Sequence, residues 1–320
     1  MPTTDNNEIT VLYLQGKSNI GDTFVVIGLE FIVKKVLKST IIHRACSPYG
    51  TVGYLTERSY YSLLRKVVPL RIREKIVYKY TRGISQAFEY VQYIDKLKYI
   101  VLGGCILTQY YVKKDLRFLL KLRNRAKILM IGVGGENYTG YEIEEVKKFL
   151  SELRPYLIVT RDPYAYELYS EHAEFAYNGI DNAYFVSDAF VPPRLNIRYI
   201  ILNFDHMREP DVPNPENLPI IRIHNTTKGI PRKWLRYSNF FVSDYPEDYL
   251  TLIANAEFIY TDRVHTAVVA IAYNRPYKYY GVQYKHLGKQ IRASIIKRVE
   301  GKDLKLEKEK ELKFIAEVLR

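Results

Sequence analysis

The sequence has few of the features that mark metalloproteins and disulfide-rich domains. Its two cysteines, Cys46 and Cys105, each close an expected strand, and two thiols alone do not make a metal site. We expect both to be small buried thiols, with a disulfide as the less favoured alternative. The six histidines show no ligand spacing such as H-x-x-x-H. The sequence therefore predicts no structural zinc and no metal at the functional site.

Membrane, secretory and nucleotide-binding signals are also missing. No apolar run approaches the roughly 20 residues that a membrane span needs. The first ten residues are polar and acidic, unlike a secretory signal, so we expect a cytoplasmic protein. The glycines fit neither G-x-G-x-x-G nor the Walker Lys-Ser/Thr pattern, which disfavours a dinucleotide or ATP. No nucleic-acid-binding motif is present, and we expect no nucleic-acid partner.

The composition is that of a globular protein. The 320 residues are 47% hydrophobic and 26% charged, and the chain is long for one domain and comfortable for two. A net charge of +13 indicates an acidic partner, either nucleic acid, anionic lipid or a phosphorylated small molecule. The 30 tyrosines and many Lys, Glu and Ile residues are compatible with a heat-adapted source.

Strand and helix patterns alternate along the chain. In the first part we expect strands at 9–15, 41–45, 99–103, 128–132 and 157–160, and helices at 23–37, 56–68, 112–124, 142–153 and 163–169. In the second part we expect strands at 199–204, 220–223, 240–242, 258–260 and 277–281, and helices at 247–254, 266–273 and 306–319. Such alternation predicts βαβ units and parallel sheets.

A proline-rich stretch separates the two parts. Six of the 14 prolines fall between Pro192 and Pro219, and we place a hinge at about 190–197 and an exposed loop at 209–218. The expected units are an N-terminal lobe at 1–192, a C-terminal lobe at 193–300 and an amphipathic helix at 301–320 that packs on the lobes. The predicted fold class is α/β, with two doubly wound lobes and a cleft between their facing carboxyl edges.

A guanidinium and an imidazole stand two residues apart between an expected strand and an expected helix. Arg263 and His265 follow the apolar run 258–260 and precede the small-residue run 267–272. Open α/β sheets bind ligands at the carboxyl ends of their strands, and helix N-termini favour anions. Arg263 would then hold an anion and His265 would carry protons. The alternative is that His265 caps the turn and Arg263 pairs with Asp262.

Loops with glycine follow three of the expected strands. Their residues are Gly16, Asn19, Gly21 and Asp22 after the first strand, Gly103 and Gly104 after the strand at 99–103, and Gly132 and Gly134 after the strand at 128–132. Glycine lets the backbone approach a ligand closely, so these loops would line the floor of one cleft. The alternative is ordinary turn chemistry, with an Asn or Asp capping the first helix.

Another arginine and two basic segments are further candidates. Arg161 ends the strand at 157–160 and either faces the cleft or forms a surface pair with Asp162. The segment that begins with Arg65 and ends with Arg82 holds seven basic residues against one acidic residue, and so does the segment that begins with Lys113 and ends with Lys127. A solvated helix face is the default for both. The alternative is docking to anionic lipid at the inner face of the membrane.

These motifs, in this order, resemble the polysaccharide pyruvyl transferase family. No single piece is specific, but the set and its order are, over about residues 11–290. The matching pieces are Gly16…Asn19-Ile20-Gly21-Asp22, Val101-Leu102-Gly103-Gly104, Ile131-Gly132-Val133-Gly134, Val159-Thr160-Arg161-Asp162, Asp181-Asn182-Ala183-Tyr184-Phe185, Tyr260-Thr261-Asp262-Arg263-Val264-His265 and Asn274-Arg275-Pro276.

The resemblance implies a fold, a reaction and roles for particular residues. The fold is two Rossmann-like lobes similar to glycosyltransferase B enzymes. The reaction is transfer of pyruvate from phosphoenolpyruvate, as co-substrate and without a further cofactor, to a sugar diol as a ketal. Carried over, His265 with Arg263 is catalytic, and the donor is held by Arg161, Arg263, Lys285 and Arg208. Arg208 would stand in for an arginine that the family often has at the end of the first strand of the second lobe.

The acceptor and two competing functions stay open. The resemblance implies a sugar of a cell-surface polysaccharide or of a lipid-linked glycan precursor as acceptor. The chain departs from the family pattern at Cys105, Asn182 and Thr266, where glycine, proline and a smaller residue are usual. A nucleotide-sugar-dependent glycosyltransferase of the same shape is one alternative. A non-catalytic glycan or anion binder is the other.

Overall fold

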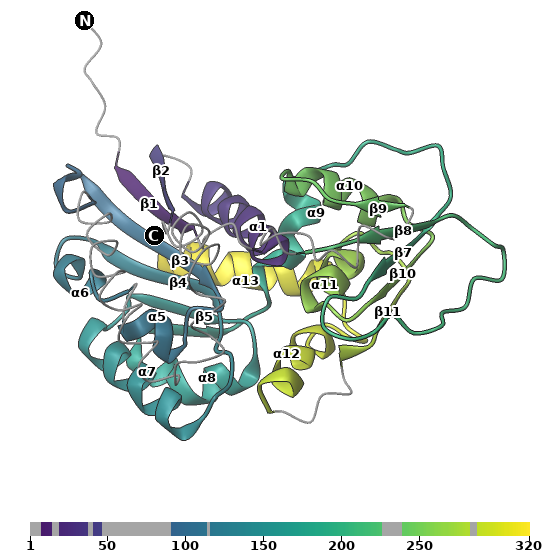
Figure 1. The fold of residues 1–320 in the computed structure, drawn as a ribbon. Helices are drawn as coiled ribbons and strands as arrows, with labels where there is room; N and C mark the ends of the chain where they lie inside the picture. Colours follow the sequence, from purple (N-terminus) through teal and green to yellow (C-terminus); the bar gives the residue numbers. More distant parts are fainter. Residues whose placement is uncertain are drawn as a thin grey trace, which may run out of the picture.

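The chain forms two parallel β-sheets with helices packed on them (Figure 1). In the computed structural model, the structure describes residues 8–14, 19–37, 41–46, 91–113, 116–225, 239–281 and 287–320. The expected helix at 56–68 and the basic segment 65–82 lie outside the described residues. Within the described ranges, no helix combines the length and the apolar character required to cross a membrane.

The first sheet has the order β2-β1-β3-β4-β5-β6, and all its neighbouring strands run parallel. Its strands are β1 (Ile9–Leu14), β2 (Ile41–Cys46), β3 (Leu97–Gly104), β4 (Lys127–Val133), β5 (Leu157–Thr160) and β6 (Phe175–Asn178). Its helices are α1 (Ile20–Val36), α5 (Gln109–Lys113), α6 (Leu119–Leu122), α7 (Gly140–Leu153), α8 (Pro163–Tyr169) and the short η3 (Ser170–His172). The chain leaves this lobe through η4 (Asn182–Phe185) and α9 (Val186–Ala189).

The second sheet has the order β11-β10-β7-β8-β9 and is also parallel throughout. Its strands are β7 (Ile200–Asn203), β8 (Ile220–Ile223), β9 (Phe240–Phe241), β10 (Phe258–Thr261) and β11 (Tyr277–Tyr279). Its helices are α10 (Pro246–Asn255) and α11 (Val264–Ala272), followed by α12 (Leu287–Lys297) and α13 (Leu304–Val318). The two parallel sheets confirm the predicted α/β fold class with two Rossmann-like lobes.

Each sheet contains a point where the strand order reverses. In the first sheet it lies between β1 and β3, and in the second between β7 and β10. Helices that leave such neighbouring strands diverge, so open α/β sheets bind ligands at the carboxyl ends there. The predicted stretch of Arg263 and His265 follows β10, and Asn19 and Gly21 follow β1. Both therefore occupy switch points.

The last helix returns to the first lobe. In α13, Phe314 stacks on Tyr177 of β6 with ring centroids 4.8 Å apart, and Tyr156 donates its hydroxyl to the Val318 carbonyl at 3.0 Å. The apolar face of this amphipathic helix thus packs against the edge of the first sheet. The expected division at residue 192 falls between α9 and β7.

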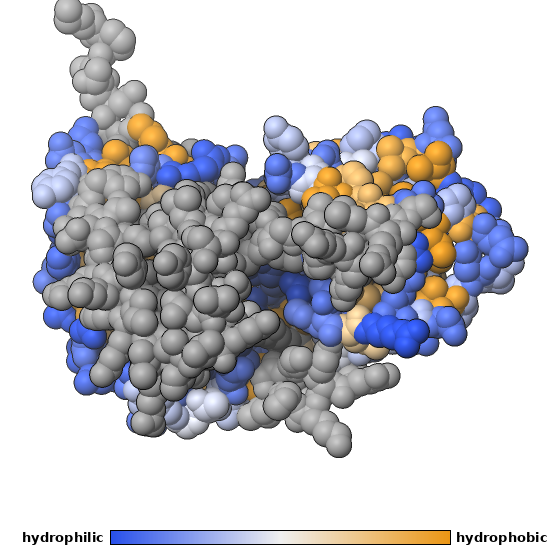
Figure 2. Space-filling model, viewed as in Figure 1, coloured by the Kyte–Doolittle hydropathy of each residue, from blue (hydrophilic) through white to orange (hydrophobic). Residues whose placement is uncertain are grey.

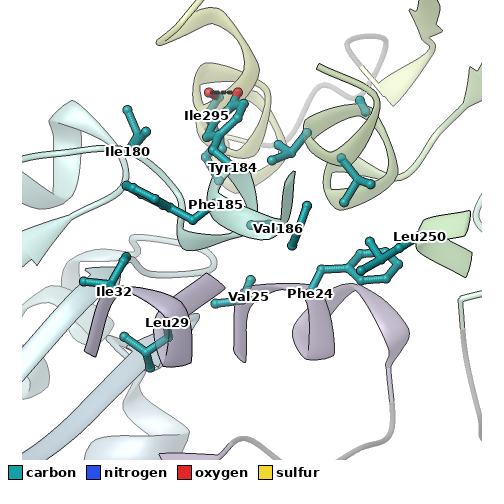
Figure 3. Close-up of a cluster of buried hydrophobic side chains, with 14 of the residues drawn as sticks. Phe24, Val25, Leu29, Ile32, Ile180, Tyr184, Phe185, Val186, Leu250 and Ile295 are labelled. Carbon is teal, nitrogen blue, oxygen red and sulfur yellow. Dashed lines mark hydrogen bonds between the residues drawn. The ribbon is translucent and has the colours of Figure 1, made fainter. Parts of the chain in front are cut away.

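One hydrophobic core runs through both lobes. Its buried members include Phe24 and Leu29 of α1, Phe185 of η4, and Ile259 and Val268 of the second lobe. Figure 3 shows α1 lying beneath the segment of Phe185 and Val186, with Leu250 of α10 beside Phe24. Because this core crosses from one lobe to the other, the lobes pack as a unit and hold their facing edges together.

Two features differ from the sequence-based expectation. The single helix expected at 112–124 is wrong: the structure has the short α5 and α6 with turns between them. The buried side chains of Val112, Leu116, Leu119 and Leu122 produce a helical spacing although the backbone is interrupted. Strand β6 and helix α12 were not expected from the pattern. In the space-filling view, orange apolar side chains are visible among blue polar ones on the second lobe, at the right of Figure 2.

Gly28 is required where α1 crosses η4. A Cβ atom there would lie 1.8 Å from the Asn182 carbonyl oxygen, which is backbone and cannot move aside cheaply. We expect Gly28→Ala to lower the free energy of unfolding by about 1–3 kcal/mol or more, despite the better helix propensity of alanine. Denaturant unfolding measures this change. Gly140→Ala at the start of α7 is the control, since its Cβ would meet nothing within 4 Å. Similar stabilities for the two variants would contradict the packing argument.

Candidate functional site

The loop between β10 and α11 is built by hydrogen bonds of its own residues. The Arg263 N–H donates to Thr261 Oγ1 at 2.9 Å, which turns the chain into the helix. The Asp262 carboxylate accepts three backbone N–H bonds from Asp205, His206 and Met207, at 2.8–3.1 Å. Asp262 thus ties this loop to the loop after β7. The alternative in which Asp262 pairs with Arg263 is not what the structure shows.

His265 lies at the contact between the two lobes. Its Nδ1 would be 2.6 Å from a Cβ atom on Gly21, so the ring edge lies directly against the start of α1. Its Nε2 is 3.7 Å from Oδ2 of Asp181, which follows β6 of the first lobe. The side chain is 15% exposed. The imidazole of the second lobe is therefore largely enclosed by residues of the first lobe.

Asp181 is a fully buried carboxylate whose Oδ2 faces both His265 and Arg161. Arg161 Nη1 donates to Asp181 Oδ2 at 3.0 Å, and the Ala183 N–H donates to Oδ1 at 2.8 Å. Burial opposes ionisation most strongly, but His265, Arg161 and the Ala183 N–H together lower the pKa of Asp181 to about 2. Asp181 is therefore a fixed negative charge that orients the His265 ring.

Arg161 does not lie where the expected donor-binding role would place it. Its side chain is only 4% exposed and is directed at Asp181 rather than at solvent. A surface pair with Asp162 is also not what forms, because Asp162 Oδ1 caps α8 and Asp162 Oδ2 accepts from the Tyr138 hydroxyl at 2.9 Å. Contact between Arg161 and a donor stays a prediction. It would require the donor to reach a guanidinium that is now buried.

Arg263 spans the two lobes at the same place. Its Nη2 donates to Asn19 Oδ1 at 3.2 Å, its Nη1 contacts His206 Nε2, and its Nε is 3.5 Å from Asp205 Oδ2. The guanidinium is 17% exposed. A planar guanidinium offers several N–H donors, and it binds carboxylate or phosphate oxygens through two of them at once.

Asn19 explains both the start of α1 and its contact with the second lobe. Its Oδ1 accepts the Gly21 N–H at 3.0 Å, which caps the helix, and also accepts from Arg263. The Ile20 N–H donates to the Asn225 carbonyl at 2.7 Å. The alternative of a capping Asn at the first loop is therefore correct. These two N–H groups of α1 therefore have partners within the protein.

A second polar network, centred on Asp205 and not identified from the sequence, lies against Arg263. Asp205 accepts from His224 Nδ1 and from the Asn225 N–H, the latter at 3.2 Å. Burial raises the pKa of Asp205, but the His224 bond and the Arg263 charge outweigh it, so the pKa is lowered. The Thr266 hydroxyl donates to Asn203 Oδ1 at 2.7 Å. His224 and Asn225 end β8, and only the sheet order brings them beside β7 and α11.

The remaining glycines pack against protein side chains instead of lining a ligand cleft. A Cβ on Gly132, whose φ is +63°, would lie 2.3 Å from Asn182 Oδ1, and one on Gly103 would lie 2.8 Å from Asn182 Nδ2. A Cβ on Gly134 would be 2.8 Å from Arg161 Nε. Gly104, with φ +88°, stands at a register shift between β3 and β4. These glycines make room for Asn182 and Arg161, the residues that flank Asp181.

The other predicted site residues are less well placed or lie elsewhere. Asp22 sits in the first turn of α1, and Arg208 is exposed in the loop after β7. Gly16 and Lys285 lie outside the described residues. Cys105 is half-buried, and its Sγ donates to the Gly135 carbonyl at 3.2 Å. Among the residues that the structure describes, no group of three or more His, Cys, Asp or Glu side chains could hold a metal ion.

Comparison with known proteins gives a family and a fold. The family model of polysaccharide pyruvyl transferases matches residues 19–276. No curated protein matches the sequence significantly. The match begins at Asn19 and includes Arg161, Asp181, Arg263 and His265.

Solved structures agree in overall fold at low sequence identity. UDP-GlcNAc 2-epimerase from Neisseria meningitidis bound to UDP-GlcNAc aligns at a TM-score of 0.50 and 11% identity, over 97% of this chain and 94% of the epimerase. The S. aureus MnaA–UDP structure aligns at 0.50 and 14%, over 91% and 87%. The glycosyltransferase SnogD from Streptomyces nogalater aligns at 0.45 and 12%, over 87% and 84%. The two structures that align at 0.50 agree with the predicted fold of two Rossmann-like lobes.

Removing the Asp181 charge is expected to destabilise the protein strongly. Asp181→Asn leaves Arg161 buried without a countercharge, and we expect a loss of about 3–5 kcal/mol in unfolding free energy at pH 7. The folded pKa is lowered from 3.8 to about 2, so the stabilisation is present above pH 3.8 and disappears as the pH falls through 2. The difference between the variant and the wild type, measured by denaturant unfolding, should therefore narrow below about pH 4.

Asp188→Asn is the matched control for this measurement. Asp188 is 41% exposed and pairs with Lys308, and removal of such a partly exposed partner costs about 1 kcal/mol or less. Equal losses for the two variants at pH 7 would contradict the assignment of Asp181 as a buried, structure-bearing charge.

Proposed function

We propose a pyruvyl transfer reaction for this chain, which belongs to the polysaccharide pyruvyl transferase family. In this proposal pyruvate moves from phosphoenolpyruvate to a sugar of a cell-surface glycan precursor as a ketal. The observation that supports it most is the position of His265 between Gly21 and the ionised Asp181, with Arg263 at the same interlobe edge. A proton carrier and a cation together suit a reaction that protonates carbon and releases phosphate.

The proposed role of His265 follows from which ring nitrogen faces Asp181. A carboxylate at Nε2 favours a proton on that nitrogen, so Nδ1 is left to exchange a proton with substrate, which would have to approach it beside Gly21. Protonated Nδ1 would give its proton to the methylene carbon of phosphoenolpyruvate, and C2 would become an oxocarbenium-like centre. The 3.7 Å distance from Nε2 to Asp181 is longer than a direct hydrogen bond. Such contacts commonly tighten when the substrate binds.

Proton and phosphate balance completes the proposed reaction. One sugar hydroxyl attacks C2 and loses its proton, which restores the proton on the catalytic base. The C2–O bond to phosphate then breaks, and the phosphate leaves with the bonding electron pair. The second hydroxyl attacks C2, closes the ring and releases its proton to phosphate or solvent. Arg263 would hold the carboxylate or the departing phosphate, because a guanidinium binds such groups through two parallel N–H donors.

The remaining parts of the proposal concern partners and location. We propose a glycan or lipid-linked sugar as acceptor, and a chain that works in the cytoplasm, with contact to the inner face of an anionic membrane. Of the two basic segments that support this contact, 65–82 lies outside the described residues. In 113–127, Lys113 pairs with Glu145 at 3.1 Å, whereas Lys121 and Arg123 are exposed. We also propose that Arg208 and Lys285 help to bind the donor.

A phosphate-release assay tests the proposed reaction. We expect the protein to release inorganic phosphate from phosphoenolpyruvate only when a sugar acceptor with two suitably placed hydroxyls is present. The nucleotide-sugar alternative draws its support from the fold shared with structures that hold UDP or UDP-GlcNAc.

Thermal unfolding distinguishes the two proposed donors, because a ligand at 100 times its Kd stabilises the folded protein by about 2.7 kcal/mol. Stabilisation by UDP and not by phosphoenolpyruvate would refute pyruvyl transfer. Binding of either ligand without turnover would favour a non-catalytic binder.

His265→Ala tests the acid/base role. We expect turnover to fall by about 10²–10⁴ while the fold is kept, because the variant loses the proton carrier but no buried charge. Steady-state phosphate release measures the loss, and circular dichroism with thermal unfolding checks the fold. His172→Ala, on the outer side of the first lobe and bonded to Ser151, is the control and should keep its turnover. A folded His265→Ala protein with unchanged turnover would rule out the assignment.

A further inference from the structure

The segment that carries Asp181 is held by the two C-terminal helices, which lie beyond the family match. In α13, Glu311 Oε2 accepts the Ile180 N–H at 2.8 Å. Just after α12, Arg298 Nε donates to the Gly179 carbonyl at 3.2 Å, and its Nη2 donates to the Asn178 carbonyl. The carbonyls of Asn178 and Gly179 and the N–H of Ile180 therefore bond to side chains that lie beyond the family match, which ends at residue 276.

The fit of Glu311 against this segment is close. Glu311 is fully buried, and a Cβ atom on Gly179 would lie 2.3 Å from its Oε2. The bond of the Ile180 N–H to Glu311 fixes the peptide unit that joins Gly179 to Ile180, immediately before Asp181. Because Asp181 directly follows Ile180, a shift of this peptide moves the carboxylate relative to His265. A displacement of about 1 Å in a catalytic group costs about 10²-fold in rate.

We propose that Glu311, together with Arg298, is a positioning residue that holds Asp181 against His265. Neither touches the substrate, and both act through the backbone at 178–180. The kinetic part of this inference rests on the proposed pyruvyl transfer. The geometric part does not, since it concerns only the contact of two protein side chains.

Glu311 performs this role as a neutral carboxyl group. Burial raises the pKa of Glu311 to about 8; the Ile180 N–H and the Arg298 charge lower it, while Asp181 and Glu307 raise it. The Tyr177 hydroxyl also faces this carboxyl from β6. Above pH 8 the site would hold a second buried negative charge behind Asp181. Repulsion between the two carboxylates then favours movement of the 178–181 segment, and activity should decline through this pH range.

Stability has a matching pH dependence. The folded protein keeps the Glu311 proton between the unfolded value of 4.5 and about 8, whereas the unfolded chain releases it. The contribution of Glu311 to the unfolding free energy is therefore fully present below pH 4.5. It is lost as the pH rises through about 8. Glu311→Gln has the shape and donor capacity of the neutral carboxyl but does not titrate. Its melting temperature relative to wild type should rise between pH 5 and pH 8.

Three variants separate positioning from general destabilisation. Glu311→Gln keeps the acceptor for the Ile180 N–H, Glu311→Ala removes it, and Glu309→Gln changes an exposed carboxyl on the same helix. We expect Glu311→Ala to lower kcat about 10- to 100-fold with KM for phosphoenolpyruvate within about twofold. Glu311→Gln should keep the wild-type kcat at pH 7 and lose the decline above pH 8. Glu309→Gln should match wild type at every pH.

A second readout needs no turnover. The ¹⁵N shifts of the His265 ring report which nitrogen carries the proton, and we expect Nε2 to carry it in wild type and in Glu311→Gln. In Glu311→Ala the ring should become a mixture of tautomers, because Asp181 no longer fixes it. If phosphoenolpyruvate is not turned over but this pattern holds, the proposed reaction fails and the positioning role stands. A fixed Nε2 tautomer in folded Glu311→Ala, or a Glu311→Gln profile that declines like wild type, would overturn the inference.

Discussion

The buried carboxylate of Asp181 is the interaction on which the site depends. It takes one charged partner, Arg161, from its own lobe and one ring, His265, from the other lobe. A buried carboxylate is unfavourable unless its charge and its lone pairs are all matched. Because the ionised Asp181 needs a matching partner, Nε2 of His265, rather than Nδ1, faces it. The stability of the site and the orientation of the His265 ring arise from one set of contacts.

The contact between lobes is as important as the contacts within them. One hydrophobic core includes α1 and η4 of the first lobe and α11 of the second. Asn19 caps α1 and at the same time accepts from Arg263, so the start of that helix is joined to the second lobe by a polar bond as well. With apolar packing behind it and hydrogen bonds at its edge, the interface keeps Gly21 and His265 in register.

Departures from the family pattern have local structural consequences in this chain. Asn182, where proline is usual, donates to the Ile131 carbonyl at 2.8 Å and fills the space that Gly103 and Gly132 leave. Thr266, where a smaller residue is usual, bonds to Asn203 and accepts from Asn225. Both substitutions add side-chain hydrogen bonds beside Asp181 or beside the start of α11. They change how the interlobe edge is supported, while Arg263 and His265 directly follow β10.

The sequence by itself determined the parallel sheets and the switch-point position of Arg263 and His265, because periodicity and strand-end motifs are local properties of the chain. It did not reveal that Arg161 turns inward, that the glycines accommodate Asn182, or that Glu311 supports Asp181. Those relations join residues 20 to 131 positions apart, and no local spacing encodes them. Only the tertiary structure decided them, since burial forces each buried charge and each backbone N–H to find a partner wherever the packed chain brings one near.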